Sequence, residues 1–225
     1  MTPEQLTGRE MTHLISAETR FQSILVNHKV KQDLIRLIEA AYCEGFELEV
    51  ASGFRDFNRQ RLIWNNKFSG KAPVLDKHSK PLNTTLLDDN TKINAIMRWS
   101  ALPGASRHHW GTDFDVYAKN KVPINTELQL EPWEYLTGHQ VKFYQWLKAS
   151  AAQYGFFFPY AKDRGGVAAE PWHISHRSSS SECLSSLTVD IVKSALKQES
   201  IKGLPSVIQQ LETLYTQYIT NICPE

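Results

Sequence analysis

Histidines and carboxylates gather in two short segments of the chain. Residues 106–115 read Ser-Arg-His-His-Trp-Gly-Thr-Asp-Phe-Asp, and residues 170–173 read Glu-Pro-Trp-His. A catalytic zinc site needs three nitrogen or oxygen ligands from the protein and an open fourth position for water. Glu170 precedes the last histidine by three residues and is a candidate base acting on that water. The candidate metal ligands are His108, Asp115 and His173.

The spacing of Glu170 and His173 constrains their local structure. Residues three apart in a regular strand point to opposite faces, so an ideal strand cannot aim both side chains at one metal. Pro171 lies between them, cannot donate a hydrogen bond to a sheet, and favours extended or turn geometry for Glu170. We therefore expect His173 within a strand and Glu170 at the rim of that strand.

The elements that must position these side chains follow from the hydrophobic pattern. Apolar residues recur at helical spacing before Gly45, and the next segment alternates apolar and polar residues as a half-buried strand does. That strand leads into Gly53-Phe54-Arg55, after which Asp56 is typical of a helix N-cap. A short helix is expected after Thr2. The longer expected elements are a helix over 29–44, a strand over 46–52 and a helix over 57–67.

The rest of the chain predicts an α+β domain. Residues 71–90 have no sustained periodicity, which indicates a long loop of the kind that often borders a site. Residues 112–118 alternate as a strand with Asp113 and Asp115 on one face. We expect a small antiparallel sheet that carries the zinc site, flanked by helices, with extra C-terminal helices. The remaining expected elements are a helix over 141–153, strands over 156–158 and 172–176, a polar connector over 178–181, and helices over 184–197 and 207–222.

The joint pattern resembles the zinc D-Ala-D-Ala carboxypeptidases and dipeptidases of bacteria, the VanY-like family with the hedgehog-type peptidase fold. That family has a Ser-x-His-x-x-Gly-x-Ala-x-Asp segment and a Glu-x-Trp-His segment. Residues 52–56 and Gln60 resemble an arginine-containing element that lies upstream in the family. The resemblance spans about residues 30–176. The matching residues in the two metal segments are Ser106, His108, Gly111, Asp115, Glu170, Trp172 and His173.

The resemblance implies a role for each of these side chains. The three ligands would hold one zinc ion per chain, and Glu170 would activate water and return the proton to the leaving amine. Arg55 would stabilise the oxyanion, since a fixed guanidinium contributes most in a water-poor site; its alternative role is an ion pair with a nearby acid. Ser106 and Gln60 are candidates for substrate contact, and Ser106 has the alternative of bracing the turn before His108.

Two positions depart from the family pattern. Asp113 stands where the family usually has a small residue, and it is grouped here with the substrate-binding candidates. Three roles are open to it: an acid that orients a metal ligand, a contact for a substrate amine, or the ligand itself, with Asp115 preferred as the ligand on spacing. Asp56 replaces the serine common after the arginine, where it fits a helix cap.

Neighbouring polar residues fall into two groups. His109 is expected to point away from the adjacent ligand on an extended chain, and His176 lies three residues beyond a proposed ligand. Both histidines are assigned to structure rather than to chemistry. Tyr160 and Asp163 are candidates for closing over a bound substrate.

Composition excludes several classes of function. The 225 residues include 25 Lys plus Arg and 24 Asp plus Glu, so a net charge of +1 provides no global attraction for nucleic acid or anionic lipid. No apolar run approaches the roughly 20 residues of a membrane span, and no export signal is visible. We expect no nucleic-acid or membrane partner and a cytoplasmic location. Three widely spaced cysteines predict free thiols.

Together these features predict a single peptidase domain over 1–225, with a catalytic core over about 30–176 and a C-terminal helical segment over about 184–223. The predicted function is zinc-dependent removal of a C-terminal D-Ala from a muropeptide or another D-Ala-terminated peptide. A dipeptidase or cell-wall endopeptidase is an alternative with the same chemistry. The alternative from another class of function is a non-catalytic, zinc-stabilised binding module. The presence of Glu170 and Arg55 favours the enzyme, because a structural zinc site needs neither residue.

Overall fold

The computed structural model describes residues 1–76 and 79–224. Its central feature is a four-stranded sheet with the order β3-β4-β6-β5, in which every neighbouring pair is antiparallel. This sheet confirms the α+β prediction, and its strands begin and end within two residues of the expected bounds. The strands are β3 (Leu48–Ser52), β4 (Asp113–Ala118), β5 (Phe156–Phe157) and β6 (His173–His176).

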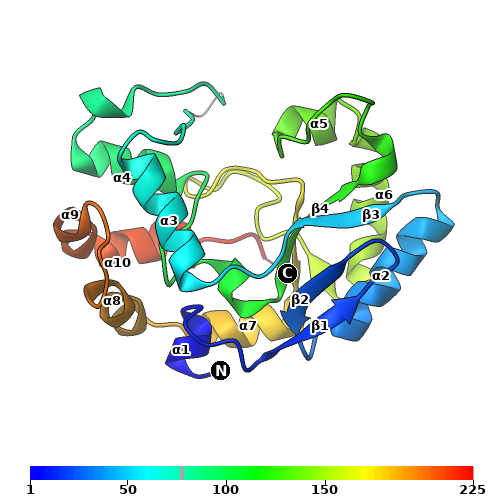
Figure 1. The fold of residues 1–225 in the computed structure, drawn as a ribbon, viewed down its shortest axis with the longest axis horizontal. Coiled ribbons are helices and arrows are strands. Elements are labelled where there is room, and N and C mark those ends of the chain that lie inside the picture. The colour runs from blue at the N-terminus through cyan, green and yellow to red at the C-terminus, as the bar shows by residue number, and fades with distance from the viewer. Residues whose placement is uncertain (77–78, 225) are drawn as a thin grey trace.

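Helices and apolar residues form two cores, which Figure 1 shows on opposite sides of the molecule. One core joins the sheet to α2 (Lys31–Cys43), α5 (Pro132–Leu136) and α6 (Val141–Ser150). The other core is almost entirely helical. Its helices are α1 (Pro3–Leu6), α3 (Phe57–Phe68), α4 (Asp89–Met97), α7 (Arg177–Ser186), α8 (Val189–Lys197), α9 (Leu204–Gln209) and α10 (Leu211–Leu214).

The expected helix caps are present. The Thr2 hydroxyl accepts from the backbone N–H of Gln5 at the start of α1, and the Asp56 carboxylate accepts from that of Arg59 at the start of α3. Each cap satisfies a backbone donor that the first helical turn leaves without a partner. Asp56 therefore fixes where α3 begins, directly after Arg55.

A two-stranded hairpin, β1 (Leu14–Glu18) and β2 (Ser23–Asn27), was not expected from the sequence. It packs against the turn between β4 and the short 3-10 helix η2 (Arg107–Trp110): the Asn27 N–H donates to the Gly111 carbonyl at 2.9 Å. Gly111 has a φ of 65°, and a Cβ there would lie 2.8 Å from the Asn27 nitrogen. Only glycine suits this left-handed turn beneath the hairpin.

Three expectations about irregular segments need correction. The long loop over 71–90 contains an isolated bridge between Leu75 and Pro81 and a 3-10 turn, η1 (Thr84–Leu86), before α4 begins; Lys77 and His78 lie outside the described residues. The polar connector over 178–181 is helical, as part of α7, because Ser179 and Ser180 are buried against the fold. The two C-terminal helices are shorter than expected.

The C-terminal helical pattern is interrupted twice. Leu187 and Thr188 separate α7 from α8, with Thr188 capping α8, and the last segment passes through α9 and α10 into a π-helical turn over Tyr215–Ile219. These short helices pack on α3 and α4 in the helical core. No helix in the described ranges combines the length and the apolar character that crossing a membrane requires.

Candidate metal and catalytic site

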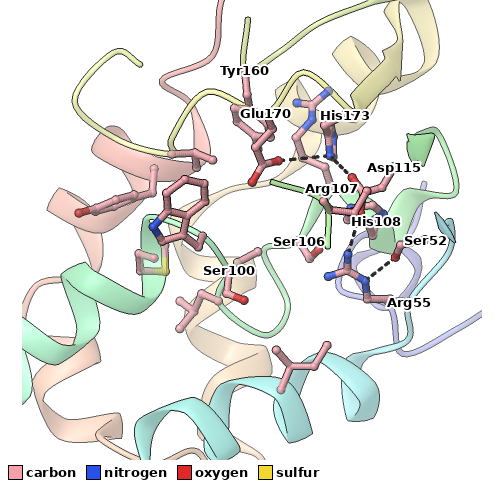
Figure 2. A pocket seen from close by; sticks show the side chains of 18 of the residues that line it. Ser52, Arg55, Ser100, Ser106, Arg107, His108, Asp115, Tyr160, Glu170 and His173 are labelled. Carbon is pink, nitrogen blue, oxygen red and sulfur yellow. Dashed lines mark hydrogen bonds and ion pairs between the residues drawn. The ribbon is translucent and has the colours of Figure 1, made fainter. Parts of the chain in front are cut away.

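The three proposed ligands come together from separate elements. His108 lies on η2, Asp115 on β4 and His173 on β6, and Asp115 and His173 are directly paired in the β4–β6 register. One ligand atom from each residue lies within 4.8 Å of the other two. The structure thus brings together the His-Asp-His set that the spacing predicted (Figure 2).

Each histidine has one ring nitrogen held by the protein. His108 Nδ1 donates to the Gly53 carbonyl at 2.9 Å, which leaves Nε2 facing Asp115 Oδ2 at 3.4 Å. His173 Nε2 lies 3.1 Å from Asp113 Oδ1, and its Nδ1 lies 3.0 Å from Asp115 Oδ1. Partners of this kind fix the tautomer and orientation of histidines that bind metals. Nε2 of His108 and Nδ1 of His173 are therefore the nitrogens available to a metal.

Asp113 lies behind His173. It is fully buried, accepts from Arg107 Nε at 2.7 Å and Thr112 Oγ1 at 2.6 Å, and does not line the cavity described below. A substrate contact, one of its three open roles, does not fit this position. The geometry favours the orienting role, because Asp113 holds the ring nitrogen of His173 that points away from the metal position.

The charges at this cluster favour a cation. Burial alone would lower the pKa of His173, but its hydrogen bonds to Asp113 and Asp115 raise it to about 9. Burial would likewise raise the pKa of Asp115, but the adjacent histidines and Arg55 lower it to about 2. The two buried carboxylates stay ionised and attract positive charge. The donor set, two imidazoles and one carboxylate, matches that of a catalytic zinc site with an open fourth position.

Glu170 lies at the rim of the sheet, as expected. A turn places it there: the His173 N–H donates to the Glu170 carbonyl at 3.1 Å, and the Glu170 N–H donates to the Tyr160 carbonyl at 2.9 Å. Glu170 Oε2 is 3.6 Å from His173 Nδ1, beside the metal position. Burial raises the pKa of Glu170 to about 7, so its carboxyl can both take up and release a proton near neutral pH.

Arg55 lies across the cluster from Glu170 (Figure 2). Its guanidinium donates to Ser52 Oγ at 3.0 Å, to Gln60 Oε1 at 3.1 Å and to Asp115 Oδ2 at 3.3 Å. Gln60 was expected to contact substrate, but it is fully buried and does not line the cavity. It lies on the inward stripe of α3 and holds Arg55 in place.

A cavity of about 470 Å³ opens beside the cluster. His108, Asp115, His173, Glu170 and Arg55 line it, as do Ser106 and Tyr160, whose ring packs on that of His173 with 5.0 Å between centroids. The buried Ser106 hydroxyl lines the cavity and has no partner among the described residues. Asp163 does not line the cavity; it is exposed and forms an ion pair with Arg98 at 2.5 Å, so its expected contact with substrate does not fit this position.

The two remaining histidines have structural partners. His109 accepts from the Gly104 N–H at 3.1 Å through Nε2 and donates to the Arg55 carbonyl at 2.7 Å through Nδ1. Its side chain points away from that of His108, as expected, but the reason is the 3-10 turn of η2 and not the extended chain that the sequence predicted. His176 lies 3.0 Å from Asp33 and 3.2 Å from Ser179.

Two residues of the site were not predicted from the sequence. Arg107 is buried and forms an ion pair with Asp113. The two residues have opposite charges and lie six apart in the sequence, but only the turn of η2 brings their side chains together. Lys67 lines the cavity from α3. The i, i+4 spacing of Arg59, Ile63 and Lys67, which all line the cavity, is the signal that would have indicated a common face.

One cavity here receives an aspartate and a histidine from the antiparallel sheet, a second histidine from η2 and a glutamate from the turn before β6. This arrangement defines a metal-dependent hydrolase. The family model described as VanY, D-alanyl-D-alanine carboxypeptidase, matches residues 23–179. The chain therefore belongs to the VanY family of D-alanyl-D-alanine carboxypeptidases.

Curated relatives include proteins of two kinds. An uncharacterized protein of Haemophilus influenzae is 44% identical over 106 residues, covering 45% of this chain and 70% of that protein. The putative carboxypeptidase YodJ of Bacillus subtilis is 25% identical over 164 residues, and a D-alanyl-D-alanine carboxypeptidase of Enterococcus faecalis is 28% identical over 151 residues. These matches cover 72% and 66% of this chain, and 50% and 47% of those longer proteins.

Solved structures share the fold. A mutant of the vancomycin-resistance D,D-pentapeptidase VanY in complex with Zn(II) superposes with a TM-score of 0.52 and 22% identity, covering 77% of this chain and 85% of that one. The LD-carboxypeptidase LdcB gives a TM-score of 0.54 and 21% identity, covering 84% of this chain and 80% of that one.

Proposed function

We propose that the chain is a zinc-dependent carboxypeptidase that removes a C-terminal D-Ala from peptidoglycan-type peptides, with one zinc ion per chain. The observation that carries this proposal is the placement of Glu170 Oε2 3.6 Å from the ring nitrogen that His173 has available for the metal. A purely structural zinc site has no use for such a carboxylate and usually takes four protein ligands.

In this proposal His108, Asp115 and His173 hold the zinc. When bound, the ion supplies Lewis-acid chemistry, polarising the substrate carbonyl and making the attacking water more acidic. Asp113 keeps His173 oriented from behind.

Glu170 carries the proton. It removes a proton from the water that attacks the scissile carbonyl and delivers that proton to the nitrogen of the departing D-Ala. Its raised pKa of about 7 suits both steps, because a group with a pKa near the working pH is able to accept and donate with little cost.

Arg55 stabilises the negative charge that develops on the carbonyl oxygen. Ser52 and Gln60 hold its guanidinium in place before substrate arrives, so little reorganisation is needed during the reaction. Ser106 is placed to contact the substrate, since its hydroxyl lines the cavity and is unpartnered within the described chain.

The test is a mass-spectrometric assay of D-Ala release by the zinc-loaded protein from muramyl pentapeptide and tetrapeptide. We expect release from at least one peptide, loss of release with a chelator, and a rate about 100- to 10,000-fold lower for Glu170→Ala. The peptide that is cut faster identifies the enzyme as a D,D- or an L,D-carboxypeptidase. Cleavage of neither peptide, with zinc bound, contradicts the proposal and favours a binding module.

A further inference from the structure

A second charged group lines the same cavity away from the metal cluster. Lys67, on the third turn of α3, is partly buried, and its ammonium donates to Ser100 Oγ at 2.9 Å. This is the one hydrogen bond that the ammonium makes within residues 1–76 and 79–224, and no carboxylate of those residues pairs with it. Removing an ammonium from water without a counter-ion costs free energy, so an anion bound beside Lys67 would be stabilising.

The surroundings of Lys67 reinforce that requirement. Apolar side chains from α3, α4 and the C-terminal segment, among them Ile63, Met97 and Ile219, line the same cavity. Burial lowers the pKa of Lys67, the positive charge of Arg55 lowers it further, and the negative charge of Glu170 offsets part of this shift. Glu170 acts on Lys67 from a distance, but no carboxylate of residues 1–76 and 79–224 forms an ion pair with the Lys67 end of the cationic wall formed by Arg55, Arg59 and Lys67.

Ser100 completes a pair of donors. Because its oxygen accepts from Lys67, its own O–H remains available, and the described chain offers it no acceptor. Figure 2 shows Ser100 and Ser106 on the same side of the cavity. An ammonium and a neighbouring hydroxyl that both donate into one cavity match the two oxygens of a carboxylate.

We propose that Lys67 and Ser100 form a carboxylate-binding subsite, and that it takes the free C-terminal carboxylate of the peptide being cut. The inference rests on the proposed function, which it deepens by making Lys67 a determinant of exopeptidase specificity. A substrate whose C-terminus is amidated or extended supplies no anion to the partly buried Lys67 and binds more weakly for that reason.

The test compares Lys67→Met, which keeps the side-chain length but removes the charge, with the wild type on matched substrates. One pair ends in D-Ala with a free carboxylate or a carboxamide; a second pair carries D-glutamate or D-isoglutamine upstream. Lys142→Met, on the exposed face of α6, is the control. We expect the wild type to prefer the free acid by about 10- to 100-fold in kcat/KM, mostly through KM, and Lys67→Met to lose most of that preference.

The outcomes separate the two proposals. A lost preference within the upstream pair supports a carboxylate subsite that reads the glutamate instead of the terminus. An equal loss of kcat/KM on acid and amide overturns the subsite, because a merely structural lysine does not distinguish them. If the wild type cuts no peptide, the proposed function fails; calorimetric binding of D-Ala-D-Ala to wild type and Lys67→Met then tests the subsite alone, and equal affinities overturn it.

Discussion

The two walls of the cavity differ in how their polar groups are partnered. On the sheet wall, the ring nitrogens of His108 and His173 and the carboxylate of Asp115 have partners in the chain, and Asp113 supports His173 from behind this wall. On the helical wall, the Lys67 ammonium donates only to the Ser100 hydroxyl within the described chain, and Ser106, at the start of η2 where the two walls meet, has no partner there. Paired groups are preorganised for chemistry, whereas unpaired buried groups await a ligand. We infer that catalysis lies on the sheet wall and recognition on the helical wall.

Arg55 bridges the two walls, and its replacement should have the largest effect. We expect Arg55→Met to lower kcat/KM by about 100- to 1000-fold while zinc stays bound, because the oxyanion loses its stabilising charge. Steady-state kinetics and metal content of the same sample measure both quantities. An unchanged rate with weakened zinc binding would show instead that Arg55 serves only as an ion-pair partner of Asp115.

Glu170 should reveal its burial through the pH dependence of stability in metal-free protein. Its pKa is raised from 4.5 to about 7, so the folded state binds more protons than the unfolded state between those values. The free energy of unfolding therefore falls as pH rises through this window. We expect Glu170→Gln to be more stable than the wild type by about 2–3 kcal/mol at pH 8 and equal to it at pH 4, measured by urea unfolding. A difference independent of pH would contradict the buried carboxylate.

Replacing Asp113 tests whether its hydrogen bond to His173 increases the zinc affinity of the site. We expect Asp113→Asn to weaken zinc binding by about 10- to 100-fold, because the His173 ring loses its charged orienting partner. Competition with a chelator measures the affinity, and thermal unfolding shows that the variant is folded. Asp33→Asn is the matched control, since Asp33 holds the structural His176 in a similar contact. Unchanged affinity in Asp113→Asn would contradict the orienting role, and it would equally exclude Asp113 as the metal ligand.

The candidate metal ligands were predictable because their spacing along the sequence is local. Alternation over residues 112–118 places Asp115 on one strand face, and Pro171 implies the turn that puts Glu170 at the rim. Gln60 was placed wrongly because the helical pattern alone does not tell which polar residue of α3 faces the core. Lys67 was missed because its meaning depends on α4 and the C-terminal helices, which pack against α3 only in the folded chain.

We propose that His108, Asp115 and His173 hold one zinc ion, and that hydrolysis requires both this ion and Glu170. Elemental analysis of the dialysed wild type and Glu170→Ala, alongside the D-Ala assay, tests it most directly. We expect about one zinc per chain in both proteins and D-Ala release by the wild type alone. Absence of bound metal after reconstitution, or undiminished release by Glu170→Ala, would contradict it.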